Sequence, residues 1–296
     1  MKHILLAALL LICINAAALR PENDDRNQAK AQETAKTATA VVETRFKGQP
    51  IEAVEVGFAF NAVIKHSDKT GVQISIDSRL QPYLICKLTD GKLTIGMKGD
   101  RPQYLNYGAY WVCKPTAVIS VKTLDEIKAD GAAKVELQGI FEVEGFKVRT
   151  GGAAKVNGLN VRTEGPVAIE SSGAGKLTGA QFGNPSKVSV DAGGASQISF
   201  ACHTSTLSID ADGAARIEAS GSATHLSADL SGAAKCQLGE LKAKTAGCTT
   251  SGASRIDCLA TGDLSASASG ASHITCKGNP RVLKKEASKA SSINVL

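Results

Sequence analysis

Large aromatic side chains are scarce in this sequence. Phe, Trp and Tyr together make up 4% of its 296 residues, while glycine alone occurs 29 times. A compact globular core normally depends on large side chains for much of its buried area. The scarcity therefore argues against one thick core and favours a thin interior that is filled by many small side chains.

Motifs for catalysis and for metal binding are also missing. The sequence contains no His-Glu-x-x-His, no Gly-x-Ser-x-Gly and no phosphate-binding loop. Its five histidines are scattered, and none of them has the spacing of a zinc ligand. We therefore expect no catalytic residues, no metal site and no cofactor. The formal net charge of +6 permits weak attraction to acidic polymers, but we expect no nucleic-acid partner.

A long apolar run occurs only at the N-terminus. Lys2 precedes an apolar run from Ile4 to Ile14, and small residues follow up to Ala18. This is the layout of a secretory signal, so we predict that residues 1–18 are a signal peptide that is cleaved after Ala18. The mature protein would then be exported, as a periplasmic, outer-membrane-associated or secreted protein. No other segment reaches the roughly 18 apolar residues of a membrane-spanning helix, so we expect no transmembrane segment after cleavage.

A motif of the form Gly-Ala-small-basic-aliphatic recurs through the second half of the chain, at spacings of 18 to 21 residues. Its eight copies begin at Gly131, Gly152, Gly173, Gly194, Gly213, Gly232, Gly252 and Gly270. Apolar residues alternate before each glycine, for example Val188 and Val190, which indicates a strand with one buried face. Strands this short bury a core only when equivalent strands stack on one another.

These features predict an all-β fold, a right-handed parallel β-helix or solenoid with about eight Gly-Ala coils over residues 124–296. The eight repeat glycines would form the structural corners, where backbones approach closely and a positive φ is required. Residues 19–44 are polar and contain no aromatic residue, so we predict a polar tether there.

Residues 45–123 differ from the repeats. Residues 51–63 look like a worn copy of the repeat, and Asp90-Gly91 between two alternating runs predicts a hairpin. We therefore expect an N-terminal antiparallel β cap together with the first coils. A predicted loop holds Tyr104, Tyr107, Tyr110 and Trp111. These rings either plug the end of the solenoid or stack on sugar rings.

A basic residue follows most corner glycines by three positions. The candidate ligand-binding basic row consists of Lys134, Lys155, Lys176, Arg216, Lys235, Arg255 and His273, with Gln197 at the remaining position. An acidic row of Glu170, Asp191, Asp210 and Asp229 lies three positions before its glycines, and Lys128 and Arg149 add positive charge there. Either the two rows neutralise each other, at about 0–1 kcal/mol per pair, or the basic row binds a linear acidic polymer such as a uronic-acid glycan or lipopolysaccharide.

Two cysteines occupy equivalent places in adjacent coils. Cys258 and Cys276 each lie six residues after their corner glycine, and the stacking distance of the coils suits a disulfide. They are a candidate disulfide or, alternatively, two small buried thiols.

At this point the sequence resembles a known family, the putative auto-transporter adhesin head domains, also called head GIN domains. The resemblance rests on residues 54–63, the hairpin at residues 90–95, residues 118–127 and the Gly-Ala repeats. It implies a fold similar to pectin-lyase-type β-helices, a role in adhesion and no conserved catalytic residues. The sequence departs from the family's name because it contains no Gly-Ile-Asn tripeptide.

We therefore predict an exported, non-enzymatic surface or envelope binding module with an adhesive or glycan-related role. Its expected partner is an anionic glycan or another cell-envelope component, and a homo-oligomer is compatible with the sequence. Two alternatives stay open. A polysaccharide lyase or hydrolase would need clustered Asp, Lys and Arg beside long loops, whereas the turns here are short. A self-assembling envelope scaffold would stack its coils end to end.

Overall fold

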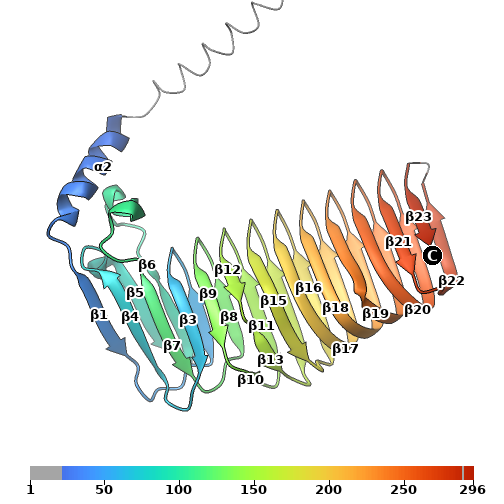
Figure 1. The fold of residues 1–296 in the computed structure, drawn as a ribbon, viewed down its shortest axis with the longest axis horizontal. Coiled ribbons are helices and arrows are strands. Elements are labelled where there is room, and N and C mark those ends of the chain that lie inside the picture. Colours follow the sequence, from blue (N-terminus) through green and yellow to red (C-terminus); the bar gives the residue numbers. More distant parts are fainter. Residues whose placement is uncertain (1–21, 289) are drawn as a thin grey trace, which may run out of the picture.

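The computed structural model describes residues 22–288 and 290–296. The predicted signal peptide and its cleavage site lie outside these residues. The fold is a mostly-β solenoid of about eight turns with a short N-terminal helix, α2 (Glu22–Ala35). Figure 1 shows the strands stacked side by side along the long axis, with the helix beside the N-terminal end. No helix in the described part of the chain is long and apolar enough to cross a membrane.

Each coil of the repeat region contains a strand that leads into the corner glycine and a strand that leaves it. The leading strands are β8 (Glu126–Ala129), β11 (Phe146–Thr150), β14 (Pro166–Ser171) and β16 (Lys187–Ala192). The leaving strands are β9 (Lys134–Gln138), β12 (Lys155–Asn157), β15 (Lys176–Gly183), β21 (His273–Lys277) and β23 (Ser292–Val295). In the later coils one long strand covers most of the circuit, as in β17 (Gln197–Ala211), β18 (Arg216–Leu230), β19 (Lys235–Thr250) and β20 (Arg255–Ala268). The remaining strands of this region are β10 (Phe141–Glu142), β13 (Asn160–Arg162) and β22 (Arg281–Ala287).

The coils stack in parallel register, so equivalent residues form columns along the axis. Val188 faces Leu207, and Leu207 faces Leu226 one coil further on. All three are buried, while the residues that alternate with them point outward. The period of two therefore places one apolar set of every coil in a single continuous core.

The repeat tolerates no side chain at its corner glycines, because of their backbone angle and their close contact with the preceding coil. Each of the eight has a φ between +57° and +72°, in the left-handed region. A Cβ on Gly213 would lie 2.7 Å from the carbonyl oxygen of Gly194 in the preceding coil. That carbonyl accepts a hydrogen bond of 2.7 Å from the backbone N–H of Ala214. Only glycine provides both the backbone angle and the space for this contact.

The N-terminal cap, residues 22–123, is built differently. Its antiparallel strands are β1 (Ala40–Arg45), β4 (Gly71–Asp77), β5 (Leu84–Thr89) and β6 (Lys92–Met97), together with β7 (Thr116–Val121). The predicted Asp-Gly hairpin is confirmed, because β5 and β6 pair antiparallel and both turn residues have positive φ. Three short 3₁₀ helices lie between the strands, η1 (Gln81–Tyr83), η2 (Gln103–Asn106) and η3 (Gly108–Tyr110).

The worn copy of the repeat is also confirmed as the first coil. Strands β2 (Ala53–Val56) and β3 (Asn61–His66) pair in parallel with β8 and β9. Phe58 lies at the corner position, with a φ of +61°, directly below Gly131. Phe58 is the first residue of the column, so no earlier coil lies below it. Its ring packs against Trp111 of the cap instead.

The sequence predicts a polar tether for residues 19–44. The described part of this segment, from residue 22, is instead a helix docked on the cap followed by a strand. Residues 40–45 belong to the sheet, and helix α2 buries Ala31 against the cap. Arg79 fastens this helix by donating hydrogen bonds of 3.0 Å to the Ala31 carbonyl and the Thr34 hydroxyl. A polar helix with one small buried residue leaves no apolar stripe in the sequence, so composition alone does not reveal the docking.

Asp77 holds Arg79 in place at the centre of the cap. Its carboxylate is fully buried and accepts hydrogen bonds from the Arg79 guanidinium at 2.8 and 3.0 Å and from the Val112 backbone N–H at 3.0 Å. Burial by itself would raise the pKa of Asp77, but these hydrogen bonds outweigh it and lower that pKa. The pair therefore joins β4, the helix and the loop that follows η3.

Candidate ligand-binding surface

The predicted basic row exists as a line of register partners. Lys155 pairs with Lys134 on one side and with Lys176 on the other, and Lys176 pairs with Gln197. The line continues through Arg216, Lys235, Arg255 and His273 in successive coils. Seven intervals of roughly 4.8 Å make the row about 34 Å long. All these cationic side chains are exposed except that of Lys176, which is half-buried.

Most cations of this row have no internal partner. Arg255 forms an ion pair with Asp257 at 3.2 Å. His273 Nδ1 shares a hydrogen bond of 2.8 Å with the Ser292 hydroxyl in the next coil. Within residues 22–288 and 290–296, the other cations of the row form no ion pair. Their charge is therefore available to an external anion.

The acidic row does not neutralise the basic row in this structure. Glu170, Asp191, Asp210 and Asp229 are register partners on the strands that lead into the corners. Glu170 pairs with Lys147 and, at 2.8 Å, with Arg149, both on β11 of the preceding coil. In the part of the chain that the structure describes, none of the four acids contacts a member of the basic row. The two rows lie on opposite sides of the corner.

The sequence suggested that Lys128 and Arg149 add to the positive charge beside the basic row, but the structure shows that they do not. Lys128 forms an ion pair with Glu55 at 2.7 Å, and Arg149 bridges Glu126 and Glu170. The hydrogen bond from Glu55 raises the pKa of Lys128. Both cations are neutralised by acids of neighbouring coils, which the sequence spacing could not reveal because Glu55 is 73 residues from Lys128.

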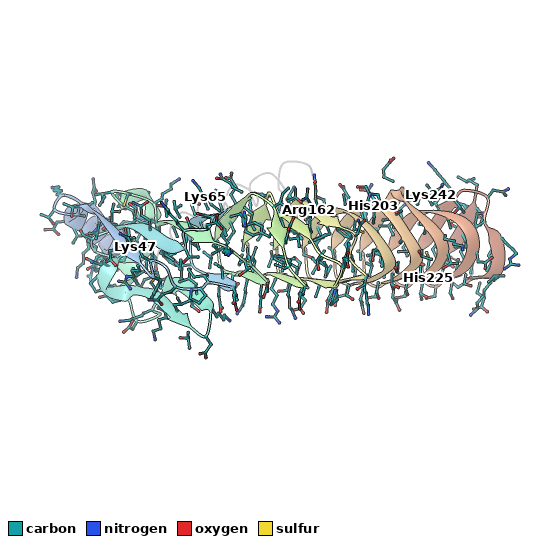
Figure 2. The ribbon with its side chains drawn as sticks, turned by 90° about the horizontal axis from the view of Figure 1, so that it is seen from below. Lys47, Lys65, Arg162, His203, His225 and Lys242 are labelled. Carbon is teal, nitrogen blue, oxygen red and sulfur yellow. The ribbon has the colours of Figure 1, made fainter. Side chains whose placement is uncertain are left out.

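A second line of basic residues follows the bend that lies opposite the glycine corners. Arg162, His203 and Lys242 lie along one edge in Figure 2, and His203 pairs through Ser222 with Lys242. Sequence reasoning missed this line because the glycines at this bend, such as Gly183 and Gly221, do not recur in a fixed motif. The coils also differ in length there, so a fixed offset from the corner does not locate it.

The aromatic loop plugs the cap rather than presenting rings to solvent. The centroids of the Trp111 and Phe58 rings lie 5.6 Å apart, and the indole N–H of Trp111 donates a hydrogen bond of 2.9 Å to the Leu105 carbonyl. The Arg101 guanidinium stacks 4.4 Å from the Phe58 ring. All four predicted aromatic residues of the loop are half-buried, which agrees with the plug and not with a sugar-stacking platform.

Cys258 and Cys276 are register partners whose thiols are free in this structure. Cys258 Sγ also lies 3.9 Å from Cys248 Sγ across the core. The contact with Cys248, and then burial, raise the pKa of the Cys258 thiol. In this structure the two cysteines are therefore buried free thiols, and the disulfide is the alternative that mass spectrometry can test.

This geometry can be compared with known proteins. A family model described as "Putative auto-transporter adhesin, head GIN domain" matches residues 51–165 and again residues 158–280. The chain belongs to this family. The head GIN model therefore covers the first coil, the cap strands β4 to β7 and the Gly-Ala repeats up to residue 280. No curated protein sequence matches the chain.

Several solved structures share the head GIN fold of this chain. A putative adhesin from Parabacteroides distasonis has a TM-score of 0.59 at 19% identity, over 87% of this chain and 97% of that chain. A putative adhesin from Parabacteroides merdae has a TM-score of 0.53 at 18% identity, over 87% and 96%. A putative lipid binding protein from Parabacteroides distasonis has a TM-score of 0.56 at 19% identity, over 86% and 96%. At these identities the likeness shows the fold.

Proposed function

We propose that this chain is an exported, non-catalytic binding module of the adhesin type that holds an anionic envelope polymer along its basic row. The observation that carries the proposal is the line of cations without internal partners, repeated at the coil spacing. A linear polyanion laid along the axis would meet one cation per coil. Repeated weak contacts of this kind add up through multivalency.

Three further points support the proposal. Membership in an adhesin family favours export, as does the signal peptide that the sequence predicts. In the described coils of residues 124–288 the corners are uniformly short, so these coils carry no long loops of the kind that build the cleft of a polysaccharide lyase. We also propose the right hand for the coil, because parallel crossovers adopt it almost without exception.

The test replaces three unpaired cations of the row by glutamine, in the triple variant Lys155→Gln, Lys176→Gln and Lys235→Gln. We expect affinity for a polyuronate such as alginate to fall by about threefold to a hundredfold at low salt, since each exposed pair is worth about 0.2–1 kcal/mol. The difference between variant and native protein should shrink as salt rises, because exposed charges are screened.

The matched control removes the same charge away from the row and from the second line, with Lys187→Gln, Lys244→Gln and Lys285→Gln. We expect this variant to bind within about twofold of the native chain, because these cations lie outside the line. Equal losses in both variants would mean that net charge alone attracts the polymer. Release of sugar fragments during the assay would instead favour the lyase or hydrolase alternative.

A further inference from the structure

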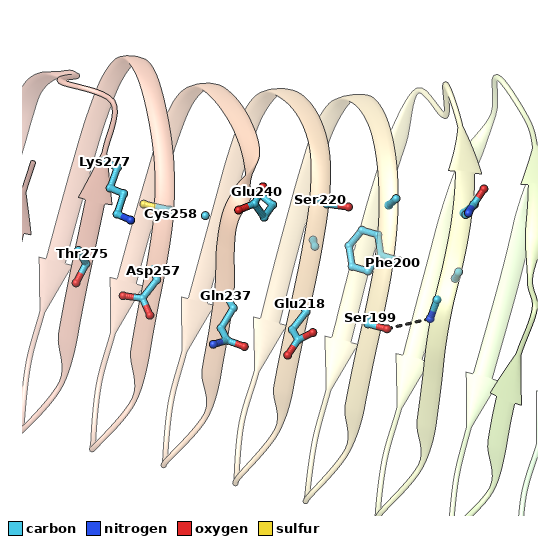
Figure 3. Close-up of a pocket in the computed structure, with 16 residues that line it drawn as sticks. Ser199, Phe200, Glu218, Ser220, Gln237, Glu240, Asp257, Cys258, Thr275 and Lys277 are labelled. Carbon is cyan, nitrogen blue, oxygen red and sulfur yellow. Dashed lines mark hydrogen bonds between the residues drawn. The ribbon is translucent and has the colours of Figure 1, made fainter.

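A groove lined by both polar and apolar groups runs along the solenoid beside the basic row. It has a volume of about 680 Å³ and crosses six strands, from β15 to β21. Its first wall is the register line Ser199, Glu218, Gln237, Asp257 and Thr275, seen as one row in Figure 3. This wall lies two residues beyond the basic row on each strand, about 7 Å away.

The groove follows from differences in coil length. Two coils of 19 residues, which start at Gly194 and Gly213, lie between coils of 21 and 20 residues. The longer coils place their surplus in irregular stretches where the register shifts, beside Gly179 and Gly239. Neither glycine has any heavy atom within 4 Å of a Cβ position. The missing side chains at these two bulges leave the space open.

The groove offers many hydrogen-bonding groups that the protein itself leaves unused. Gln181, Ser220, Glu240 and Lys277 form the second wall. Ser199 accepts a hydrogen bond from the Gly179 N–H at 2.9 Å, and Asp257 pairs with Arg255. In the described part of the chain, the side chains of Glu218, Gln237 and Glu240 form no hydrogen bond and no ion pair with other residues.

The chemistry of the walls narrows the choice of ligand. The two walls together carry three carboxylates and one lysine, so the groove disfavours nucleic acids and other polyanions. The strands of the floor are paired on both sides, so no free edge is available to a peptide strand. The only ring, that of Phe200, is 4% exposed and provides no stacking platform.

We propose that this groove is a second binding site, and that it takes a neutral, hydroxyl-rich polysaccharide chain laid along the axis. Carboxylate, amide and hydroxyl groups together accept and donate the hydrogen bonds of sugar hydroxyls. From Ser199 to Thr275 the wall extends about 19 Å, in steps of roughly 4.8 Å. A hexose unit of an extended chain advances by a comparable length, so each coil meets one sugar. The site is independent of the basic row and does not require an anionic ligand.

The experiment measures binding of the native chain to neutral, unbranched glucan, mannan and galactan, by affinity electrophoresis and calorimetry. It is run at about 1 M NaCl, where the Debye length of about 3 Å removes the contribution of the basic row. The groove variant Glu218→Ala with Gln237→Ala should bind at least about tenfold more weakly, because it deletes unshared hydrogen bonds to the sugar. Gly239→Leu, whose Cβ would meet no heavy atom within 4 Å, adds a bulky side chain at the groove and should also reduce binding at least about tenfold.

The control variant, Asp191→Ala with Asp210→Ala, removes two exposed acids outside the groove and should bind like the native chain. Thermal unfolding of each variant checks that the solenoid is intact. The proposal is overturned if the native chain binds none of the three neutral polymers, or if the groove variants bind them unchanged. A third outcome also overturns it: only alginate binds, and the groove variant binds alginate more tightly than the native chain does. The groove carboxylates would then only repel an anionic polymer and would not bind a neutral sugar. Loss of alginate binding in the basic-row variant tests the proposed function alone.

Discussion

The cap and the coils of this solenoid solve the same packing problem in opposite ways. The largest fully buried side chains lie in the cap and in the first coil that joins it, and only Leu124 and Phe141 among them lie beyond residue 123. The coils instead rely on a column of glycines whose backbones touch at every turn. The cap is held by particular side-chain contacts, such as Asp77 with Arg79, whereas the coils are held by a backbone pattern that each turn repeats.

The difference shows where each region is vulnerable. A repeat spreads its stability over nearest-neighbour contacts between turns. The cap has no such redundancy, because one buried carboxylate joins β4, the aromatic loop and helix α2. A substitution in the cap should therefore release a whole unit, while a substitution at a corner should disturb adjacent turns.

The largest effect is expected from Asp77→Ala in the cap. The change leaves the Arg79 side chain, which is 13% exposed, without its partner. Breaking a buried pair in this way costs about 3–5 kcal/mol. Denaturant unfolding should show this loss, and limited proteolysis should cleave near residues 36–39 as the helix detaches. Arg162→Ala breaks an exposed pair with Glu142 and should cost about 0–1 kcal/mol.

The same pair should make the cap sensitive to acid. The pKa of Asp77 is lower in the folded state than the unfolded value of about 3.9. Its contribution is therefore present above about pH 4 and is lost as the pH falls through the lowered folded pKa. The stability curves of the native chain and of Asp77→Ala should converge in acid, and a constant gap would contradict this account.

The next effect is expected at a corner of the coils. Gly213→Ala would place a Cβ 2.7 Å from the Gly194 carbonyl at a φ of +63°. The left-handed backbone alone costs about 1–2 kcal/mol, and the contact with backbone adds to it, so we expect a loss of at least about 2 kcal/mol. Gly239→Ala, where a Cβ meets nothing, should change the unfolding free energy by no more than about 0.5 kcal/mol. Similar losses at the two glycines would show that the column of corners is not what holds the coils.

The smallest effect is expected from the cysteines. Their different exposure to solvent allows the cap and the coils to be compared by chemical modification. Cys113 in the cap is half-buried, whereas Cys86 in the cap and the coil thiols Cys202, Cys236, Cys248, Cys258 and Cys276 are buried. Alkylation of the folded chain should modify Cys113 first and the coil thiols only after unfolding. Mass spectrometry without reductant should find Cys258 and Cys276 as separate free thiols. A linked peptide would establish the disulfide instead.

The coil thiols should also make stability depend on alkaline pH. Burial raises the pKa of Cys202 to about 12, above the unfolded value of about 8.5. Its stabilising contribution is complete below about pH 8.5 and is lost as the pH rises towards 12. Cys202→Ala should therefore unfold with a flatter dependence on pH in this range, as measured by denaturant titration. A slope equal to that of the native chain would assign the effect to other groups.

Much of the fold could be predicted because each turn repeats one pattern. The glycine spacing located the eight corners, and the alternation around them placed the basic row on the surface. The prediction failed where the pattern is interrupted. Helix α2 buries one small apolar residue, Ala31, and is otherwise held by polar contacts such as those of Arg79, and Phe58 occupies a corner position that otherwise holds glycine. Neither feature has a periodic signal.

The candidate sites divide along the same line. The basic row was visible in the sequence, but its ionic state was not, because the partners of Lys128 and Arg149 come from other coils. The groove was not visible at all, since it arises from register shifts beside Gly179 and Gly239.

The sequence by itself determined the period of the coils, the corner glycines and the outward phase of the cations. Parallel in-register stacking places equal positions of the repeat in equal places, so one local pattern suffices for these features. Only the tertiary structure decided which charges are neutralised, how the cap is fastened and where the groove opens. Each of these depends on contacts between residues of different coils, whose distances are set by the coil lengths and bulges in between.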